Sequence, residues 1–215
     1  MNILYVGSGR SAQLVKRIDL SKYKVACVNN AWRLFEKFDI WIHSGDFPSE
    51  NRPKTKNFEI EVSHREYNKA AQEMAEKLGA ATRSPSHYFG YTAFFNGLYW
   101  LMNEQPKKIS LLGFDHDYNP EKVKKWQENN KPSPQNQYLK PKDMTINEWL
   151  GDFFKGMEKD SFYGQGTPDP LRLGEKHLKD KFLLAIENAK KLNIELVNLS
   201  PVESDINMVQ KEKIQ

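Results

Sequence analysis

Short runs of apolar residues recur along the chain, and each stops at a glycine or at polar residues. The clearest runs are NILYV, KVACV, FDIWI, KKISLLGF and NIELVNL, at residues 2–6, 24–28, 38–42, 107–114 and 193–199. Each is nearly continuous in apolar character, which is typical of strands buried on both faces of a parallel sheet. The run NFEIEV at 57–62 alternates instead, so we expect it at an edge of that sheet.

Segments with helical spacing separate these strands. SAQLVKRI at 11–18 follows a Gly-Ser-Gly turn and predicts a first helix. Residues 65–79 carry a helical period that Gly79 closes, and residues 175–192 predict a long helix. The segment 90–102 is apolar nearly all round, which predicts a central helix. Strands that alternate with helices indicate an α/β fold, with a mostly parallel sheet and helices on both faces.

A long insertion interrupts this pattern. Between Tyr118 and Pro170 the periodicity weakens, and Pro, Asn, Gln and Lys accumulate around one predicted helix at 145–158. More than fifty residues between two parallel strands exceeds the usual connection, and such insertions are commonly lids or binding loops. We therefore expect a core domain of residues 1–118 and 171–201, a lid at 119–170, and a polar tail at 202–215 that frays.

The charge of the chain is concentrated in this insertion. The sequence has 32 basic and 28 acidic residues, a net charge of +4. Six lysines against two glutamates between Asn119 and Lys142 account for that excess, and the rest of the chain balances. A lysine-rich loop of this size is usually solvated and does not by itself indicate nucleic acid. The segment also suits a lid that faces a diphosphate or a polyanionic acceptor.

Composition narrows the class of protein. Hydrophobic residues make up 39% of the chain and aromatic residues 12%, enough to bury a full core and to exclude disorder over the whole length. No apolar run approaches the ~18 residues of a membrane span, and the first residues lead into a strand instead of a secretory leader. We expect a cytoplasmic protein with no stable membrane insertion.

Four predicted strands end in groups suited to hydrogen bonding or charge. These groups are Gly-Ser-Gly-Arg at 7–10, Asn29-Asn30, His-Ser-Gly-Asp at 43–46 and Asp-His-Asp at 115–117. In open parallel sheets the ligand crevice lies outside the carboxyl ends of the strands, so we expect these groups to converge on one site. The turn GSGRS lacks the third glycine of a dinucleotide fingerprint and the lysine of a phosphate loop, so a plain tight turn is an alternative.

Three blocks of the sequence resemble one enzyme family. VGSGRSAQLVKRIDLSKYKVACVNNAW, GYTAFFNGLYWL with KKISLLGFDHDY, and AKKLNIELVNLSP are similar in order and spacing to the bacterial lipooligosaccharide sialyltransferases. The motility-associated glycosyltransferases share this skeleton, as do some pterin pyrophosphokinases. The resemblance covers roughly half the chain and implies a Rossmann-like domain that binds a nucleotide, with a nucleotide sugar (CMP-, UDP- or GDP-linked) as donor.

The resemblance also implies roles for particular residues. The Gly-Ser-Gly turn would lie under the donor, and Asn29 would hold the ribose or base through its amide. Tyrosine hydroxyls from the lid would stabilise the leaving group, and arginines suit the phosphates. The implied donor contacts are Gly7, Ser8, Gly9, Arg10, Asn29, Asn30, Gly90, Tyr91, Thr92, Tyr118, Tyr163 and Arg172.

His177 corresponds to the general base of that family, which takes the proton from the acceptor hydroxyl. The alternative is a solvent-facing histidine in the first turn of a helix. Asp115 is the second candidate catalytic residue. With Asp117 it forms an Asp-x-Asp sequence that in other nucleotide-sugar transferases holds a divalent metal. The resembled family works without metal, so Asp115 alternatively anchors backbone amides, and we expect that no metal is required.

The acceptor is less well defined. SPSHYFG stands where the family carries an Arg and a Thr, which puts recognition of a sialic acid carboxylate in question. The candidate acceptor contacts are His43, Asp46, His87, Tyr88, Lys124, Lys125 and Trp126. The basic, aromatic lid suits hydroxymethylpyrimidines in DNA, as compact phage transferases modify, because lysines meet phosphates and an aromatic ring stacks on a base. A surface glycan is the other acceptor class.

The leading prediction is therefore a nucleotide-sugar-dependent glycosyltransferase. The alternatives are a metal-dependent pyrophosphokinase or other phosphotransferase on the same skeleton, and a non-catalytic nucleotide- or DNA-binding module. The sequence leaves open the nucleotide, the sugar, the stereochemical course and the oligomeric state.

Overall fold

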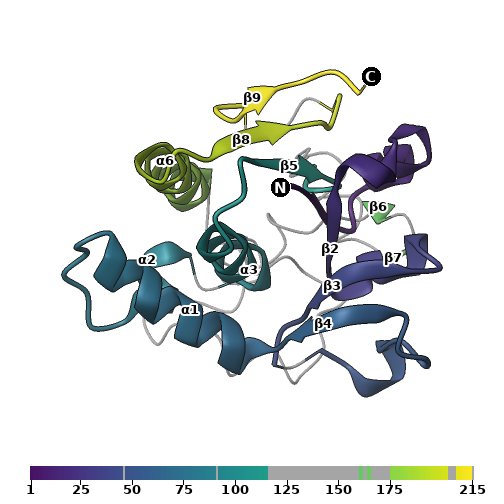
Figure 1. Ribbon diagram of the computed structural model, residues 1–215, viewed down its shortest axis with the longest axis horizontal. Helices are drawn as coiled ribbons and strands as arrows, with labels where there is room; N and C mark the ends of the chain where they lie inside the picture. Colours follow the sequence, from purple (N-terminus) through teal and green to yellow (C-terminus); the bar gives the residue numbers. More distant parts are fainter. Residues whose placement is uncertain are drawn as a thin grey trace, which may run out of the picture.

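A computed structural model describes residues 1–45, 47–90, 92–115, 160–161, 164–165, 175–202 and 207–214. For 160–161, 164–165 and 175–178 it describes the backbone alone. Within these ranges the predicted α/β class is confirmed, with a seven-stranded sheet at the centre (Figure 1). No helix in the described part of the chain is both long enough and apolar enough to cross a membrane.

Every strand pair in the central sheet is parallel. The strand order is β4-β3-β2-β1-β5-β8-β9. The strands are β1 (Asn2–Val6), β2 (Lys24–Val28), β3 (Phe38–Ile42), β4 (Phe58–Val62), β5 (Lys108–Leu112), β8 (Glu195–Asn198) and β9 (Gln210–Lys211). The chain thus moves outward from β1 to β4, returns to the other side of β1 at β5, and moves outward again. β4 lies at an edge, as its alternating pattern predicts.

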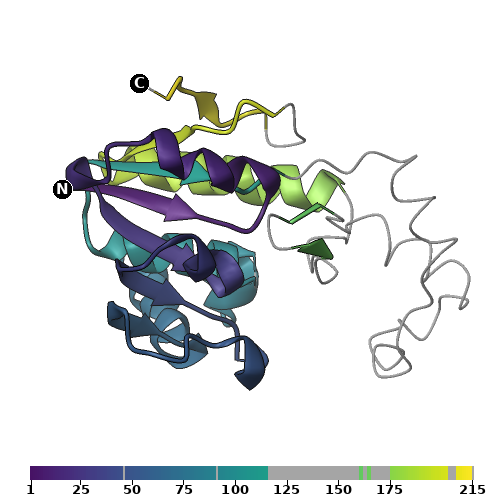
Figure 2. The ribbon, with the colours of Figure 1, turned by 90° about the vertical axis from the view of Figure 1, so that its right-hand side faces the viewer.

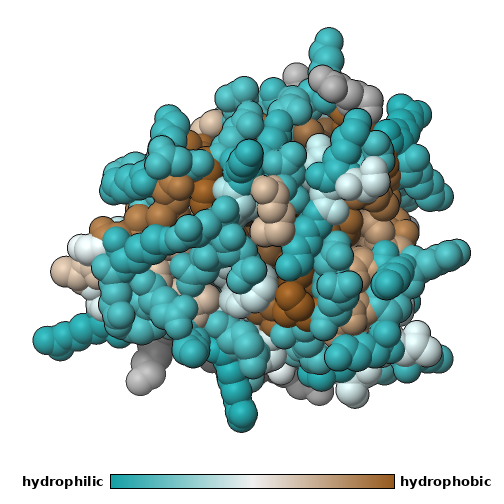
Figure 3. All heavy atoms as spheres, in the orientation of Figure 1, coloured by the Kyte–Doolittle hydropathy of each residue, from teal (hydrophilic) through white to brown (hydrophobic). Residues whose placement is uncertain are grey.

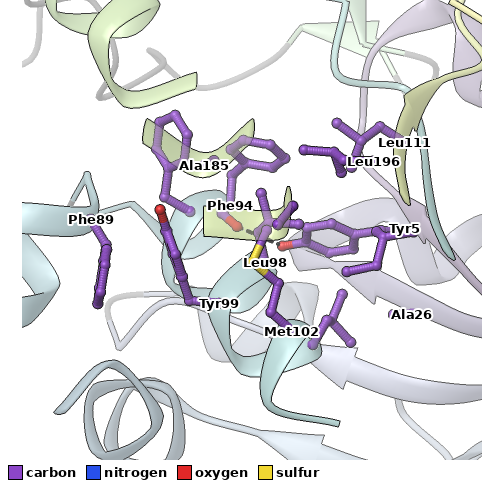
Figure 4. Packing of buried hydrophobic residues seen from close by; sticks show 14 of the residues in the cluster. Tyr5, Ala26, Phe89, Phe94, Leu98, Tyr99, Met102, Leu111, Ala185 and Leu196 are labelled. Carbon is purple, nitrogen blue, oxygen red and sulfur yellow. Dashed lines mark hydrogen bonds between the residues drawn. The ribbon is translucent and has the colours of Figure 1, made fainter. Parts of the chain in front are cut away.

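In the described residues, four α-helices lie on one face of the sheet. They are α1 (His64–Lys77), α2 (Pro85–Phe89), α3 (Ala93–Asn103) and α6 (Glu175–Lys191). α3 is buried at most positions, as its apolar sequence predicts, and the Tyr5 hydroxyl donates to the Phe94 carbonyl, 3.2 Å away (Figure 4). Further along, the ring of Tyr99 stacks on Phe89 at 3.9 Å between centroids.

The opposite face is covered differently. Alternate residues of β1 point to it, including Leu4 and Val6, and they pack against Ala12, Val15 and Ala31. These covering residues belong to 3₁₀ helices: η1 (Arg10–Arg17) and η3 (Asn29–Leu34). Two further short 3₁₀ turns are η2 (Leu20–Lys22) and η4 (Ser49–Asn51). The predicted first helix is therefore present but is 3₁₀, and in the described part of the chain the α-helices lie on one face.

The predicted element boundaries hold to within a few residues elsewhere. α1 begins one residue early, at a capping box in which Ser63 and Glu66 satisfy each other's backbone amides, and Gly79 follows its end with a φ of +66°. α3 begins at Ala93 because Thr92 caps it by accepting from the Phe95 amide.

The end of the chain differs from its prediction. Gln210–Lys211 form β9, which pairs with β8, so this part of the polar tail extends the sheet instead of fraying. Lys108 on β5 contributes to its attachment, because its ammonium contacts the carboxylates of Glu195 and Glu212.

The insertion is described at only two places. Residues Asp160–Ser161 (β6) and Gly164–Gln165 (β7) form a separate antiparallel pair. The predicted helix at 145–158 lies outside the described residues, so the lid stays a prediction.

Gly113 offers a test of the packing between β1 and β5. It has a φ of +76°, and a Cβ there would lie 2.6 Å from the Gly7 carbonyl oxygen and 2.7 Å from the Ala12 Cβ. Gly113→Ala should lower the free energy of unfolding in urea by about 2–4 kcal/mol, from left-handed strain plus crowding. Gly79→Ala is the control: its φ is +66° with nothing within 4 Å, so it should cost about 1–2 kcal/mol from strain alone. Equal losses would contradict the close approach.

Candidate functional site

The candidate site lies at the carboxyl ends of β1 and β5. These two strands are neighbours, yet the chain visits β2, β3 and β4 between them. The strand order therefore reverses between β1 and β5, and open parallel sheets commonly bind ligands at such a switch point. α6 runs back toward the start of β8, so its first residues lie at this same edge, on the side toward which the β1 arrow points (Figure 2).

The glycines of the turn after β1 are required by packing inside the protein. A Cβ on Gly7 would lie 2.5 Å from the Gly113 carbonyl oxygen, and one on Gly9 would lie 2.6 Å from Asp115 Oδ2. The Gly7 and Gly9 amides donate to the carbonyls of Leu112 and Gly113, at 2.8 and 2.7 Å. The Gly-x-Gly pattern is thus explained by the contact with β5 and does not by itself require a phosphate.

Asp115 joins three segments of the chain at this edge. Its Oδ2 accepts from the Ser11 amide at 2.9 Å. Its Oδ1 accepts from two hydroxyls, Ser11 at 2.5 Å and Ser200 at 2.7 Å. Ser200 lies two residues beyond the end of β8, and its amide donates to Asn198 Oδ1 at 2.9 Å. All of these residues are buried, Asp115 being only 5% exposed. We call this arrangement the Asp115 clamp.

The clamp bears on the predicted chemistry of Asp115. Both carboxylate oxygens already accept protein donors, and the side chain is turned into the fold, so the geometry favours the anchoring alternative over metal binding or catalysis. Among the described residues no group of three or more acidic, histidine or cysteine side chains is arranged to hold a metal ion. The other half of the Asp-x-Asp pair, Asp117, lies outside the described part.

The asparagines after β2 contact the neighbouring loops. Asn29 has a φ of +49°; its Oδ1 accepts from the Ser44 amide at 3.2 Å, and its carbonyl accepts from Trp41 Nε1 at 3.1 Å. Asn30 Oδ1 accepts from Arg33 Nε at 3.1 Å. Both amide oxygens are therefore used to shape the edge, and a contact of these residues with a donor nucleotide stays a prediction.

His43, a candidate acceptor contact, is buried instead of open to a ligand. Its ring stacks on Trp41 at 4.4 Å, and it is 3% exposed. Nδ1 lies 2.9 Å from the Ser44 carbonyl oxygen, and Nε2 lies 3.1 Å from Glu61 Oε1. Since both ring nitrogens face protein acceptors, this geometry gives His43 a structural role in joining β3 to β4.

The segment before α3 is the more accessible part of the candidate acceptor site. Tyr88 is 37% exposed, and His87 Nδ1 lies 2.9 Å from Ser84 Oγ. Lys181 of α6, which sequence reasoning missed, donates to the Tyr88 carbonyl at 2.6 Å. Gly90 follows with a φ of +125°, against the ring of Phe95. The sequence offered no signal for Lys181, because it is one lysine among several on an amphipathic helix.

The other predicted site residues divide into two groups. Arg10 is exposed at the start of η1, Ser8 is half-buried in the turn, and Thr92 caps α3. His177 lies in the first turn of α6, where the backbone alone is described. The remaining predicted residues fall outside the described part of the chain: Asp46, Tyr91, Tyr118, Lys124, Lys125, Trp126, Tyr163 and Arg172.

Comparisons of this chain with protein-family models, with curated proteins and with solved structures found no match. The similarity to lipooligosaccharide sialyltransferases therefore depends on the sequence blocks quoted above. It enters the functional interpretation as a prediction.

The Asp115 clamp predicts a specific loss of stability. Asp115→Asn exchanges one acceptor oxygen for a donor amide that must face a serine N–H or hydroxyl, so the free energy of unfolding should fall by about 1–3 kcal/mol in urea denaturation. Asp19→Asn is the matched control, because Asp19 caps η2 at the surface and asparagine caps equally well. A variant at position 115 as stable as the wild type would show that the clamp contributes nothing.

Proposed function

We propose that this protein is a nucleotide-sugar-dependent glycosyltransferase with a Rossmann-like domain. The observation that carries the proposal is the convergence of the Gly-Ser-Gly turn, the start of α3 and the start of α6 at the switch point of a parallel sheet. Switch points of this kind are where open parallel sheets bind nucleotides and other ligands. The sequence blocks shared with the sialyltransferase family support glycosyl transfer as the reaction.

Two groups are suited to the donor diphosphate. In the turn after β1, the amides of Gly7, Gly9 and Ser11 are all bonded within the protein, whereas no partner of the Ser8 amide is found among the described residues. The first amides of α3 are the second group, since helix N-termini favour anions. Phe114 joins the two: it packs on Phe94 at 4.4 Å between centroids and lies directly against Gly7.

The acceptor side follows from the position of α6. His177 lies in its first turn, at the edge of the sheet where the donor would bind. We assign it as the general base that removes the proton from the acceptor hydroxyl as the sugar carbon is attacked. The bond to the nucleotide diphosphate or monophosphate breaks in the same step, and the nucleotide leaves.

The other two predicted classes receive less support. A phosphotransferase needs a divalent metal against the transferred phosphate, and both oxygens of Asp115, the carboxylate predicted to hold it, already accept serine donors. A non-catalytic module would bind the same nucleotides without turnover. Only a measurement of sugar transfer distinguishes it from the enzyme.

Ser8 provides a test of donor binding. Nucleotides and nucleotide sugars that bind the native protein should raise its thermal midpoint by mass action. Ser8→Glu places a negative charge beside the expected phosphates and should abolish that shift, whereas the neutral Ser8→Gln, of similar size, should retain most of it. The proposal fails if no nucleotide shifts the wild type, or if the two variants respond alike.

His177 provides a test of catalysis. His177→Ala should lower the turnover of the donor found in the thermal screen by about 10²–10⁴-fold, because the acceptor proton then has no base. The donor should raise the thermal midpoint of the His177→Ala variant as much as that of the wild type. A wild type that binds nucleotide sugars but transfers nothing to any DNA or glycan acceptor would favour the binding module.

A further inference from the structure

Tyr88 is an exposed aromatic ring that the protein holds in a fixed place. With Met1 and Leu183, it is one of three large hydrophobic side chains that are exposed in the described part of the chain. Its edge packs against Phe89 at 5.2 Å between centroids, and Phe89 is fully buried in the core. An aromatic ring at the surface whose backbone is anchored in this way is ready to stack without further ordering.

Lys181 supports this ring from α6. Its ammonium lies 5.6 Å from the centroid of the Tyr88 ring and donates to the Tyr88 carbonyl oxygen. That bond uses one of its three hydrogens. Partial burial lowers the pKa of Lys181 below its ordinary value, and the adjacent Asp180 offsets this only in part. The ammonium therefore gains from any anion that approaches Tyr88.

The surroundings are poor in acidic groups. No ion pair of Lys181 or of Arg83 is found among the described residues, and residues 80–90 contain no aspartate or glutamate. Arg83 is exposed just before α2, and Asp180 is the acidic neighbour on α6. A cation and an open ring without a carboxylate partner are complementary to a ligand that is both planar and anionic.

We propose that Tyr88 and Lys181 form a stacking platform for a base of a single-stranded nucleic acid, with Lys181 contacting an adjoining phosphate. Proteins that bind single strands combine these two elements, an aromatic ring for the base and a cation for the backbone. A neutral glycan would use the ring but leave the ammonium to water. The inference rests on the proposed function only in treating the nucleic acid as the acceptor.

The test is the binding of a short fluorescein-labelled oligothymidylate to the full chain, followed by anisotropy at several salt concentrations. Tyr88→Ala should raise the Kd about tenfold, while Tyr88→Trp, which keeps a stacking face, should bind as well as the wild type. Lys181→Gln can still donate to the Tyr88 carbonyl but has no charge, so the slope of log K against log salt should fall by about 0.7.

Leu183→Ala is the matched control, because Leu183 is 52% exposed on the same helix and, two residues from Lys181, does not share its face. Figure 3 shows hydrophobic residues at the surface in the region of α6. Truncation of the exposed Leu183 side chain should leave the Kd unchanged. A thermal midpoint within error of the wild type confirms that each variant is folded, as expected because none of the three side chains is buried in the core.

Three results would overturn the platform. They are absence of oligonucleotide binding, equal affinity of Tyr88→Ala and the wild type, and Tyr88-dependent binding of neutral oligosaccharides in place of the oligonucleotide.

The donor-induced thermal shift, measured on the same variants, distinguishes the platform from the proposed glycosyltransferase. A retained shift with no role for Tyr88 in oligonucleotide binding leaves the glycosyltransferase in place without this platform. Tyr88-dependent binding with no donor shift supports the platform and removes the glycosyltransferase.

Discussion

The close approach of β1 and β5 at their carboxyl ends is the constraint on which the rest of the edge depends. Gly7, Gly9 and Gly113 bring the two turns into backbone contact, and a Cβ at any of the three would overlap a neighbouring atom. Asp115 then bonds the Ser11 amide and two serine hydroxyls in a place where water cannot replace them. Buried charge-assisted hydrogen bonds of this kind are strong when complete and costly when one partner is lost.

The clamp also fixes what remains available for a ligand. With three amides of the β1 turn committed inside the protein, Ser8 is the residue of that turn for which the described structure shows no internal partner. The aromatic contacts among Tyr5, Phe94 and Phe114 hold the start of α3 beside it. The contacts that pack the β1 turn inside the protein therefore also determine which of its groups are left for a ligand.

The two faces of the sheet bury hydrophobic clusters of different size. α1, α3 and α6 bury the larger cluster, whereas 3₁₀ turns cover the other side with short connections that keep β1, β2 and β3 adjacent. α2 and α6 meet through Lys181 and Tyr88 at the margin of the α-helical face. The turn after β1 thus belongs to the clamp, whereas Tyr88 and Lys181 belong to a contact between two helices.

The sequence by itself determined the α/β class, the positions of β1 to β5 and β8, and the edge position of β4, because burial on one or two faces leaves a direct mark on residue periodicity. It also located the polar strand ends, since parallel strands place their carboxyl ends together. Only the tertiary structure decided how those polar groups are used. Asp115 and His43 look like reactive groups along the chain, but their hydrogen-bond partners, Ser200 and Glu61, come from other strands or from beyond them. Likewise, the bond from the Ser11 amide to Asp115, the pairing of β9 and the contact between Lys181 and Tyr88 join segments distant in sequence, which local spacing does not encode.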